Sequence, residues 1–139
     1  MLNATIKADL LRYTGETSSG KFLPSLLIPG FRFTFFLRKS HQFKKNSFLG
    51  FIYRILLQLD AHFYGFQIPP STQIGKGLYI GHWGTIVINA KTIIGDYCNL
   101  SPGVTIGQTN RGKSKGTPTI GNKVWIGTNA VIVGNISIG

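Results

Sequence analysis

Aliphatic residues recur every six positions through the second half of the chain, often with glycine after them. The spacing slips once by two residues and is interrupted once by a polar gap. The aliphatic positions are Ile68, Ile74, Ile80 and Ile86, then Ile88, Ile94, Leu100 and Ile106, and finally Ile120, Ile126, Ile132 and Ile138. Neither a helix nor a strand has a period of six. A three-sided coil does, because each side is a short strand that points an aliphatic residue to the axis. The sequence therefore predicts a mainly β domain over residues 68–139, a single-stranded parallel β-helix of hexapeptide repeats.

The fifth place of each six-residue unit is also small or apolar, and we expect it to face the axis. It holds Thr92, Cys98, Val104, Val124, Ala130 and Ile136. Cys98 is therefore predicted to fill the core and not to act as a nucleophile. A single cysteine also excludes an intramolecular disulfide and a multi-cysteine metal site.

A polar and basic segment separates Ile106 from Ile120. Residues 107–119 cannot continue the apolar column, so they are predicted to form a loop that projects from a turn of the coil. Functional residues often lie on such loops. The chain ends at Gly139 within a repeat. An open coil face would leave strand edges unpaired, and we expect the β-helix to be truncated here.

Residues 1–67 have a different pattern, which predicts a short α-helical, apolar N-terminal region. Residues 6–13 look helical, and two apolar stretches follow at 22–37 and 48–64. Proline, glycine and charged residues interrupt both stretches, whereas a bilayer span needs about 20 predominantly apolar residues. Two interpretations stay open: a helix packed on the domain or on a neighbouring subunit, or peripheral contact of residues 22–64 with a membrane. In the second, Lys39, Lys44 and Lys45 meet anionic lipid.

The net charge of +11 is spread over both halves of the chain. No nucleic-acid-binding signature accompanies it, so a nucleic-acid partner is disfavoured. A phosphorylated cofactor or an anionic membrane surface explains the charge equally well. Charged residues interrupt the N-terminus before any apolar run, which argues against a secretory signal. We expect a cytoplasmic protein. If residues 22–64 contact a membrane, the protein lies at its inner face.

Two segments carry a family resemblance: IPPSTQIGKGLYIGHWGTIVINAKTIIGDYCNLSPGVTIG and, after the polar loop, PTIGNKVWIGTNAVIVGNISIG. They resemble the hexapeptide-repeat acyltransferases and, within them, the serine acetyltransferase branch. The resemblance implies a left-handed β-helix that forms a homotrimer or a higher homo-oligomer, with the active site between two subunits. It also implies O-acetyl transfer from acetyl-CoA, without a metal, to L-serine or a related small acceptor, as in cysteine biosynthesis.

Residues 48–67 favour a second acceptor. YR at 53–54 and YGFQI at 64–68 resemble the acetyltransferases of exopolysaccharide clusters, such as the colanic acid type. This resemblance implies O-acetylation of a sugar hydroxyl in polysaccharide biosynthesis. A third hypothesis, from a different class, is a β-helix scaffold subunit without catalysis.

His82 is the candidate catalytic base, because histidine exchanges protons near neutral pH and backbone at Gly81 and Gly84 can approach a ligand closely. The resemblance places the family's catalytic histidine at the same position. The serine acetyltransferases usually carry an aspartate where this chain has Gly81. They also have a second histidine where Thr117 precedes Pro118. Both departures put serine as acceptor in question, while a sugar hydroxyl would need neither residue.

Acetyl-CoA needs contacts for its pantetheine arm and its phosphates. Positions with small side chains leave room for the arm to bond the backbone, namely Gly107, Gly127, Thr128 and Ala130. Candidate phosphate contacts are Arg111, Lys113, Lys115 and Lys123. By resemblance to sugar acetyltransferases of the family, Trp125 shapes the acetyl-donor site. His41 and His62 lie outside the repeats and are interpreted as structural.

Overall fold

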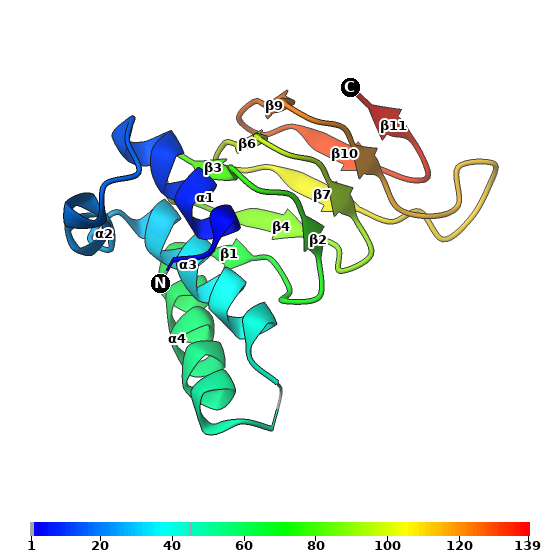
Figure 1. The fold of residues 1–139 in the computed structure, drawn as a ribbon. Helices are drawn as coiled ribbons and strands as arrows, with labels where there is room; N and C mark the ends of the chain where they lie inside the picture. Colours follow the sequence, from blue (N-terminus) through cyan, green and yellow to red (C-terminus); the bar gives the residue numbers. More distant parts are fainter. Residues whose placement is uncertain (1, 45) are drawn as a thin grey trace.

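The computed structural model describes residues 2–44 and 46–139 (Figure 1). The helical N-terminal region predicted from the sequence is present and contains α1 (Ala4–Thr14), α2 (Ser19–Ser25), α3 (Pro29–Gln42) and α4 (Phe48–Tyr64). Local signals fix the ends of these helices. Asn3 caps α1 and Ser47 caps α4 by accepting a backbone N–H, whereas Gly15 and Gly65 end the same helices in the left-handed conformation.

Short strands follow the helices and form three parallel sheets. Sheet A contains β1 (Phe66–Gln67), β4 (Ile86–Ile88), β7 (Thr105–Gly107) and β10 (Val131–Val133). Sheet B contains β2 (Gln73–Ile74), β5 (Ile93–Ile94), β8 (Thr119–Ile120) and β11 (Ser137–Ile138). Sheet C contains β3 (Tyr79–Ile80), β6 (Asn99–Leu100) and β9 (Trp125–Ile126). Each strand pairs with the strand three places along the chain, so the backbone runs as a three-sided parallel coil. Its first strand begins at Phe66, two residues before the start expected from the sequence.

The aliphatic residues spaced by six form the core of the coil, as the sequence predicts. Ile80, Ile94 and Ile120 are buried, and so are the corresponding residues of most other strands, whereas Ile74 and Ile138 are partly buried against the same core. Cys98 is also fully buried, and burial raises the pKa of its thiol. Ile136 is less buried than expected, since it is 40% exposed. It lies in the last described coil, where β11 pairs with β8 on one side only.

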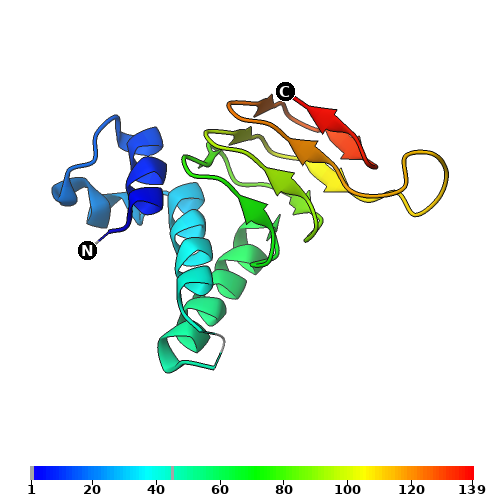
Figure 2. The same cartoon turned by 45° about the vertical axis from the view of Figure 1, so that its right-hand side comes forward.

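The helices pack against the first coil at one end of the stack (Figure 2). The Arg38 guanidinium of α3 donates to the Asp9 carboxylate of α1 (Nε–Oδ2, 2.9 Å) and to the carbonyl of Ile74 (2.6 Å). The Leu78 backbone N–H also donates to Asp9 (3.0 Å). This buried cluster therefore holds two helices and one coil together.

No helix within residues 2–44 and 46–139 is both long and apolar enough to cross a membrane. Helix α4 instead exposes an apolar stripe on its outer side. The stripe consists of Phe48, Phe51, Ile55, Leu59 and Phe63.

Candidate functional site

His82 follows β3 at the corner where the chain passes from sheet C to sheet A, and its side chain is exposed. A hollow of about 130 Å³ opens beside it. Two aromatic rings, an amide and a hydroxyl line this hollow together with backbone. The lining residues are Tyr79, Gly81, His82, Asn99, Leu100, Ser101, Pro102 and Trp125.

The register of sheet C brings these side chains together. Tyr79 pairs with Asn99, and Asn99 pairs with Trp125, so three successive coils each present one large or polar side chain to the same face. The corner itself requires glycine. Gly84 has φ +141°, and a Cβ at this position would press against Pro102 of the next coil.

A second hollow, of about 540 Å³, adjoins the first through Asn99 and Trp125. Its other lining residues are Arg12, Tyr97 and Lys123. The Arg12 side chain of α1 donates to Oδ1 of Asn99 and lies over the ring of Tyr79, 5.7 Å from its centroid. Sequence reasoning missed Arg12, because nothing in a helical pattern shows which side chain reaches a strand 87 residues away.

Several of the predicted cofactor residues lie close to these hollows. Trp125 lines both, is 76% exposed, and donates its indole N–H to Oγ of Ser101 (3.3 Å). Lys123 lines the larger hollow. Gly127, Thr128 and Ala130 form the corner after β9, above the corner that carries His82. The two corners are linked through the intervening coil, where the Asn129 N–H donates to the carbonyl of Pro102 (3.0 Å).

The remaining predicted cofactor residues lie at a different corner. Gly107 ends β7, and the loop that follows it carries the exposed side chains of Arg111, Lys113 and Lys115. This loop projects from the passage between sheets A and B, far from β3 in both ribbon views (Figures 1 and 2). Sheet A separates it from His82 within one chain. At the base of the loop, the Thr117 hydroxyl donates to the carbonyl of Lys91 (3.2 Å).

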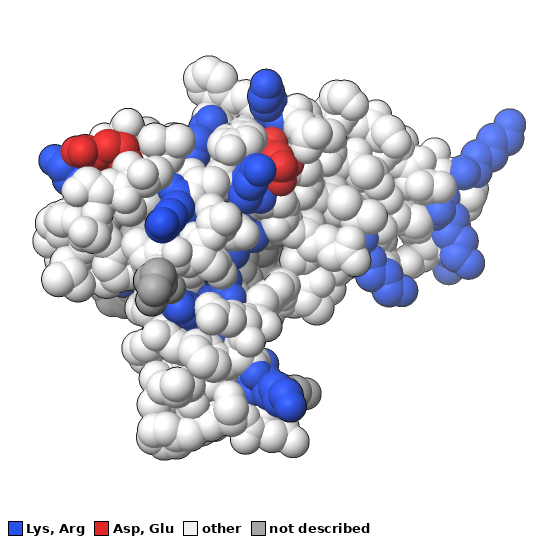
Figure 3. Space-filling view, viewed as in Figure 1, with Lys and Arg blue, Asp and Glu red and all other residues white. Residues whose placement is uncertain are grey.

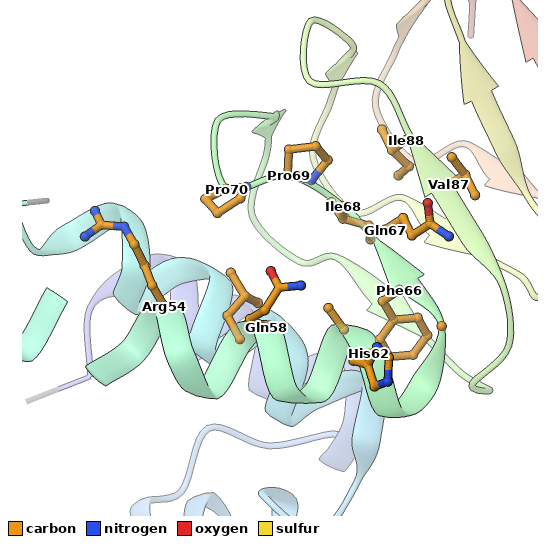
Figure 4. A pocket seen from close by; sticks show the side chains of 13 residues that line it. Arg54, Gln58, His62, Phe66, Gln67, Ile68, Pro69, Pro70, Val87 and Ile88 are labelled. Carbon is orange, nitrogen blue, oxygen red and sulfur yellow. The ribbon is translucent and has the colours of Figure 1, made fainter. Parts of the chain in front are cut away.

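A groove of about 760 Å³, larger than both hollows on sheet C, lies between α4 and the first strands of sheet A (Figure 4). His62 and Gln58 of α4 face Gln67 and Val87 across it. We do not place the reaction here despite the volume, because His82 and the predicted cofactor residues line other surfaces. His62 is the only imidazole in this lining, and His41 lines neither hollow on sheet C.

A three-sided parallel coil with six-residue repeats and a corner histidine defines the class of hexapeptide-repeat transferases. No protein-family model matches the sequence. Individual relatives do. The serine acetyltransferase of Helicobacter pylori is 35% identical over all 139 residues, which cover 81% of that protein. The serine acetyltransferase of Synechocystis is 34% identical over 99% of this chain and 55% of its own length. The chain therefore belongs to the serine acetyltransferase family.

Solved structures agree with this assignment. Soybean serine acetyltransferase superposes with a TM-score of 0.74 at 28% identity, over 98% of this chain and 56% of that chain. The Neisseria gonorrhoeae enzyme in complex with serine gives a TM-score of 0.72 at 29% identity, over 97% of this chain and 56% of its own. The Brucella abortus enzyme in complex with coenzyme A gives a TM-score of 0.73 at 25% identity, over 97% of this chain and 54% of its own. The chain thus spans about half the length of these solved proteins.

Proposed function

We propose that this chain is an acetyl-CoA-dependent O-acetyltransferase whose acceptor is L-serine or a related small molecule with a hydroxyl group. The observation that carries the proposal is the full-length similarity to the Helicobacter pylori serine acetyltransferase, together with the hollow beside His82. The similarity to neighbours bound to serine and to coenzyme A supports both substrates.

His82 is the proposed base. Its imidazole takes the proton of the acceptor hydroxyl while the oxygen attacks the thioester carbonyl carbon. The tetrahedral intermediate then breaks its C–S bond, and the imidazolium returns the proton to the departing CoA thiolate. The exposed position of His82 beside a hollow gives acceptor and donor access to the same nitrogen. No covalent enzyme intermediate is needed, so the burial of Cys98 is compatible with this chemistry.

The predicted CoA contacts fall into two groups, and we propose that they meet between subunits of a homotrimer. Lys123, Trp125, Gly127, Thr128 and Ala130 lie on or beside the sheet C face. The other group comprises Gly107, Arg111, Lys113 and Lys115 at the loop corner, which a neighbouring copy would supply. Exposed apolar side chains on the outer face of sheet A, such as Val131 (68% exposed), support burial in an oligomer. The left-handed sense of the coil belongs to the same proposal, by membership of the family.

We place the reaction in the cytoplasm, where acetyl-CoA is available, and propose peripheral contact with a membrane through residues 22–64. The apolar stripe on the outer side of α4 supports this contact, since exposed Phe and Leu side chains bury readily at the lipid boundary.

A sugar hydroxyl is the second candidate acceptor. Gly81 and Thr117 occupy positions where serine acetyltransferases usually carry an aspartate and a histidine, and the Thr117 hydroxyl donates a hydrogen bond to the backbone carbonyl of Lys91. The hollow beside His82 presents the rings of Tyr79 and Trp125, which suit the apolar faces of a pyranose better than an ammonium group. The scaffold hypothesis remains as the third candidate.

The test is CoA release from acetyl-CoA by the wild type and by His82→Ala, with L-serine or oligosaccharides as acceptors. We expect His82→Ala to lower turnover by about 10²–10⁴-fold and to leave the unfolding midpoint unchanged, because the side chain is exposed. His41→Ala is the matched control and keeps full turnover. Undiminished turnover in His82→Ala would rule out the mechanism, and absence of both turnover and CoA binding in the wild type would favour the scaffold.

A further inference from the structure

We propose that Arg12 of α1 binds the carboxylate of the acceptor and that the amino group of serine is dispensable for binding. The acceptors then form a class of small hydroxycarboxylates. L-serine is one member, and 3-hydroxypropanoate, the same molecule without its amino group, is another. This inference rests on the proposed acetyl transfer and specifies its substrate class. Lys123 and Trp125 keep the contacts with acetyl-CoA that were proposed above.

Arg12 lies at the end of the sheet C face that is nearest to the helices. Its guanidinium donates to Oδ1 of Asn99 in β6 and lies over the ring of Tyr79 in β3. Both of these partners line the hollow beside His82. Trp125 belongs to β9, two coils beyond β3 in the same sheet. The guanidinium and the proposed donor contact thus approach the site from opposite ends of one face.

The ring of Tyr79 links Arg12 to the corner that carries His82. A Cβ placed on Gly81 would lie 2.9 Å from Cε1 and 3.3 Å from Oη of Tyr79, so the ring packs on the backbone just before His82. On its other side, the Arg12 Cζ lies 5.7 Å from the ring centroid. A three-carbon hydroxy acid with a hydrogen bond of about 3 Å at each end spans one aromatic ring. Its hydroxyl can therefore meet His82 while its carboxylate meets Arg12.

The guanidinium is prepared for a carboxylate before a ligand arrives. Arg12 takes part in none of the ion pairs found within residues 2–44 and 46–139. Asn99 and Tyr79 orient it. A guanidinium has five N–H donors in one plane, and it binds a carboxylate through two parallel hydrogen bonds. Arg12 is therefore a charge-matched partner for one end of serine.

The other end of serine, its ammonium group, finds no acidic partner on this face. The chain has four Asp and Glu residues against fifteen Lys and Arg residues, and Lys and Arg atoms dominate the space-filling view (Figure 3). None of the four acids, all of which the structure describes, lines either hollow on sheet C. Asp96 accepts the backbone N–H of Lys76 (3.0 Å). The other three form ion pairs, namely Asp9 with Arg38, Asp60 with Arg32 and Glu16 with Lys21. The face therefore attracts anions.

Position 81 shows why an acid is missing at the corner. A side chain here would point at the hollow, and the serine acetyltransferases usually carry an aspartate at this place. In this chain the Tyr79 ring occupies the space, and a Cβ on Gly81 would force the ring to move. The ring that supports Arg12 is thus the ring that keeps residue 81 a glycine. Recognition of the carboxylate replaces recognition of the ammonium group.

The experiment compares L-serine with two acceptors that each lack one of its charges, using CoA release by the full chain. 3-Hydroxypropanoate lacks the ammonium group, and L-serinamide lacks the carboxylate. We expect 3-hydroxypropanoate to match L-serine in kcat/KM. L-serinamide should fall at least about tenfold below both, the loss typical of hydrogen bonds to a charged group. Calorimetric binding of the three compounds, with CoA present, should follow the same order.

Three variants assign the preference to Arg12. Arg12→Gln should lower kcat/KM for L-serine and 3-hydroxypropanoate to the value for L-serinamide and leave the affinity for CoA unchanged. Arg12→Lys keeps the charge without the planar pair of donors, so it should retain part of the preference. Lys7→Gln removes an exposed charge from the same helix and should keep all of it. Because each preference is a ratio within one variant, a loss of folded protein cancels.

Equal turnover or equal binding of 3-hydroxypropanoate and L-serinamide by the wild type would overturn the inference, and so would a preference for L-serinamide. An Arg12→Gln variant that keeps the carboxylate preference, or that loses affinity for CoA instead, would overturn it as well. Absence of both CoA binding and turnover in the wild type would instead contradict the proposed acetyl transfer, so the two failures are distinguishable.

Discussion

Replacement of Asp9 by alanine tests how the helices are held to the coil. The Asp9 side chain is 1% exposed and accepts hydrogen bonds from the Arg38 guanidinium (2.9 Å) and the Leu78 backbone N–H (3.0 Å). Asp9→Ala leaves the guanidinium without a counter-charge and the N–H without its acceptor. Both groups stay in the interior, because Arg38 also donates to backbone carbonyls of the first coil.

The expected loss of stability follows from these contacts. Removing one partner of a buried ion pair costs about 3–5 kcal/mol. Burial raises the pKa of the Asp9 carboxyl above its ordinary value of 3.8, against the opposing effect of Arg38. The folded protein therefore holds the ionised form at some cost, and we expect a loss near the lower limit, about 3 kcal/mol. A domain of this size has about 5–15 kcal/mol of stability in total, so the effect is large.

The assay is urea unfolding followed by circular dichroism at one fixed protein concentration. Glu16→Ala is the matched control, because Glu16 pairs with Lys21 at the surface (3.4 Å) and its loss should barely move the midpoint. Replacing Asp9 and Arg38 together by apolar residues should recover much of the stability, since no unpaired charge remains. Equal midpoint shifts for Asp9→Ala and Glu16→Ala would refute the reasoning.

Further predictions concern the packing of the helices, the core thiol and the apolar stripe. Gly30→Ala should destabilise the protein by about 1–3 kcal/mol, because a Cβ would overlap the backbone carbonyl of Ile80. Gly20→Ala is its control in the same urea assay, because a Cβ there would meet only Ser18 Oγ, at an ordinary contact distance of 3.7 Å. Cys98 should react with iodoacetamide only on unfolding, since it is fully buried and burial raises the pKa of its thiol. Rapid modification of the folded protein, detected by mass spectrometry, would contradict the packing. Phe63→Ser should reduce co-sedimentation with anionic vesicles several-fold, because Phe63 is among the most exposed residues of the stripe. Equal sedimentation of variant and wild type would argue against membrane contact.

The coil could be predicted from the sequence because its period is a local property. Each strand points one aliphatic residue to the axis and turns after it, so three runs of four positions spaced by six define the stack without knowledge of any distant contact. The polar gap after Ile106 identified the loop for the same reason. The exposure of Ile136 could not be predicted from the period, since the burial of a coil residue depends on what is stacked on it.

The contacts between the helices and the coil could not be predicted. Arg12 reaches Asn99 across 87 positions, and the Asp9 carboxylate accepts the N–H of Leu78 across 69. In the sequence, Arg12 and Asp9 are ordinary polar residues of an amphipathic helix, and that pattern gives no information about which strand the helix meets. The roles of His82, Lys123 and Trp125 on the coil stay predictions, and nothing in the sequence indicated that Arg12 of the helix lies beside them.

The corner that carries His82 and the Arg12 side chain are held in place in different ways. The corner that presents His82 is fixed by stacked backbone, because the N–H of Gly103 donates to the carbonyl of Thr85 and the N–H of Asn129 donates to the carbonyl of Pro102. Arg12, in contrast, comes from a helix that contacts sheet C through side chains. Replacement of Arg12 therefore changes the charge beside the hollow of Asn99 and Trp125, while the backbone hydrogen bonds of the coil stay as they are. We therefore expect a substitution at Arg12 to alter ligand affinity at this hollow and to leave the corner that carries His82 in place.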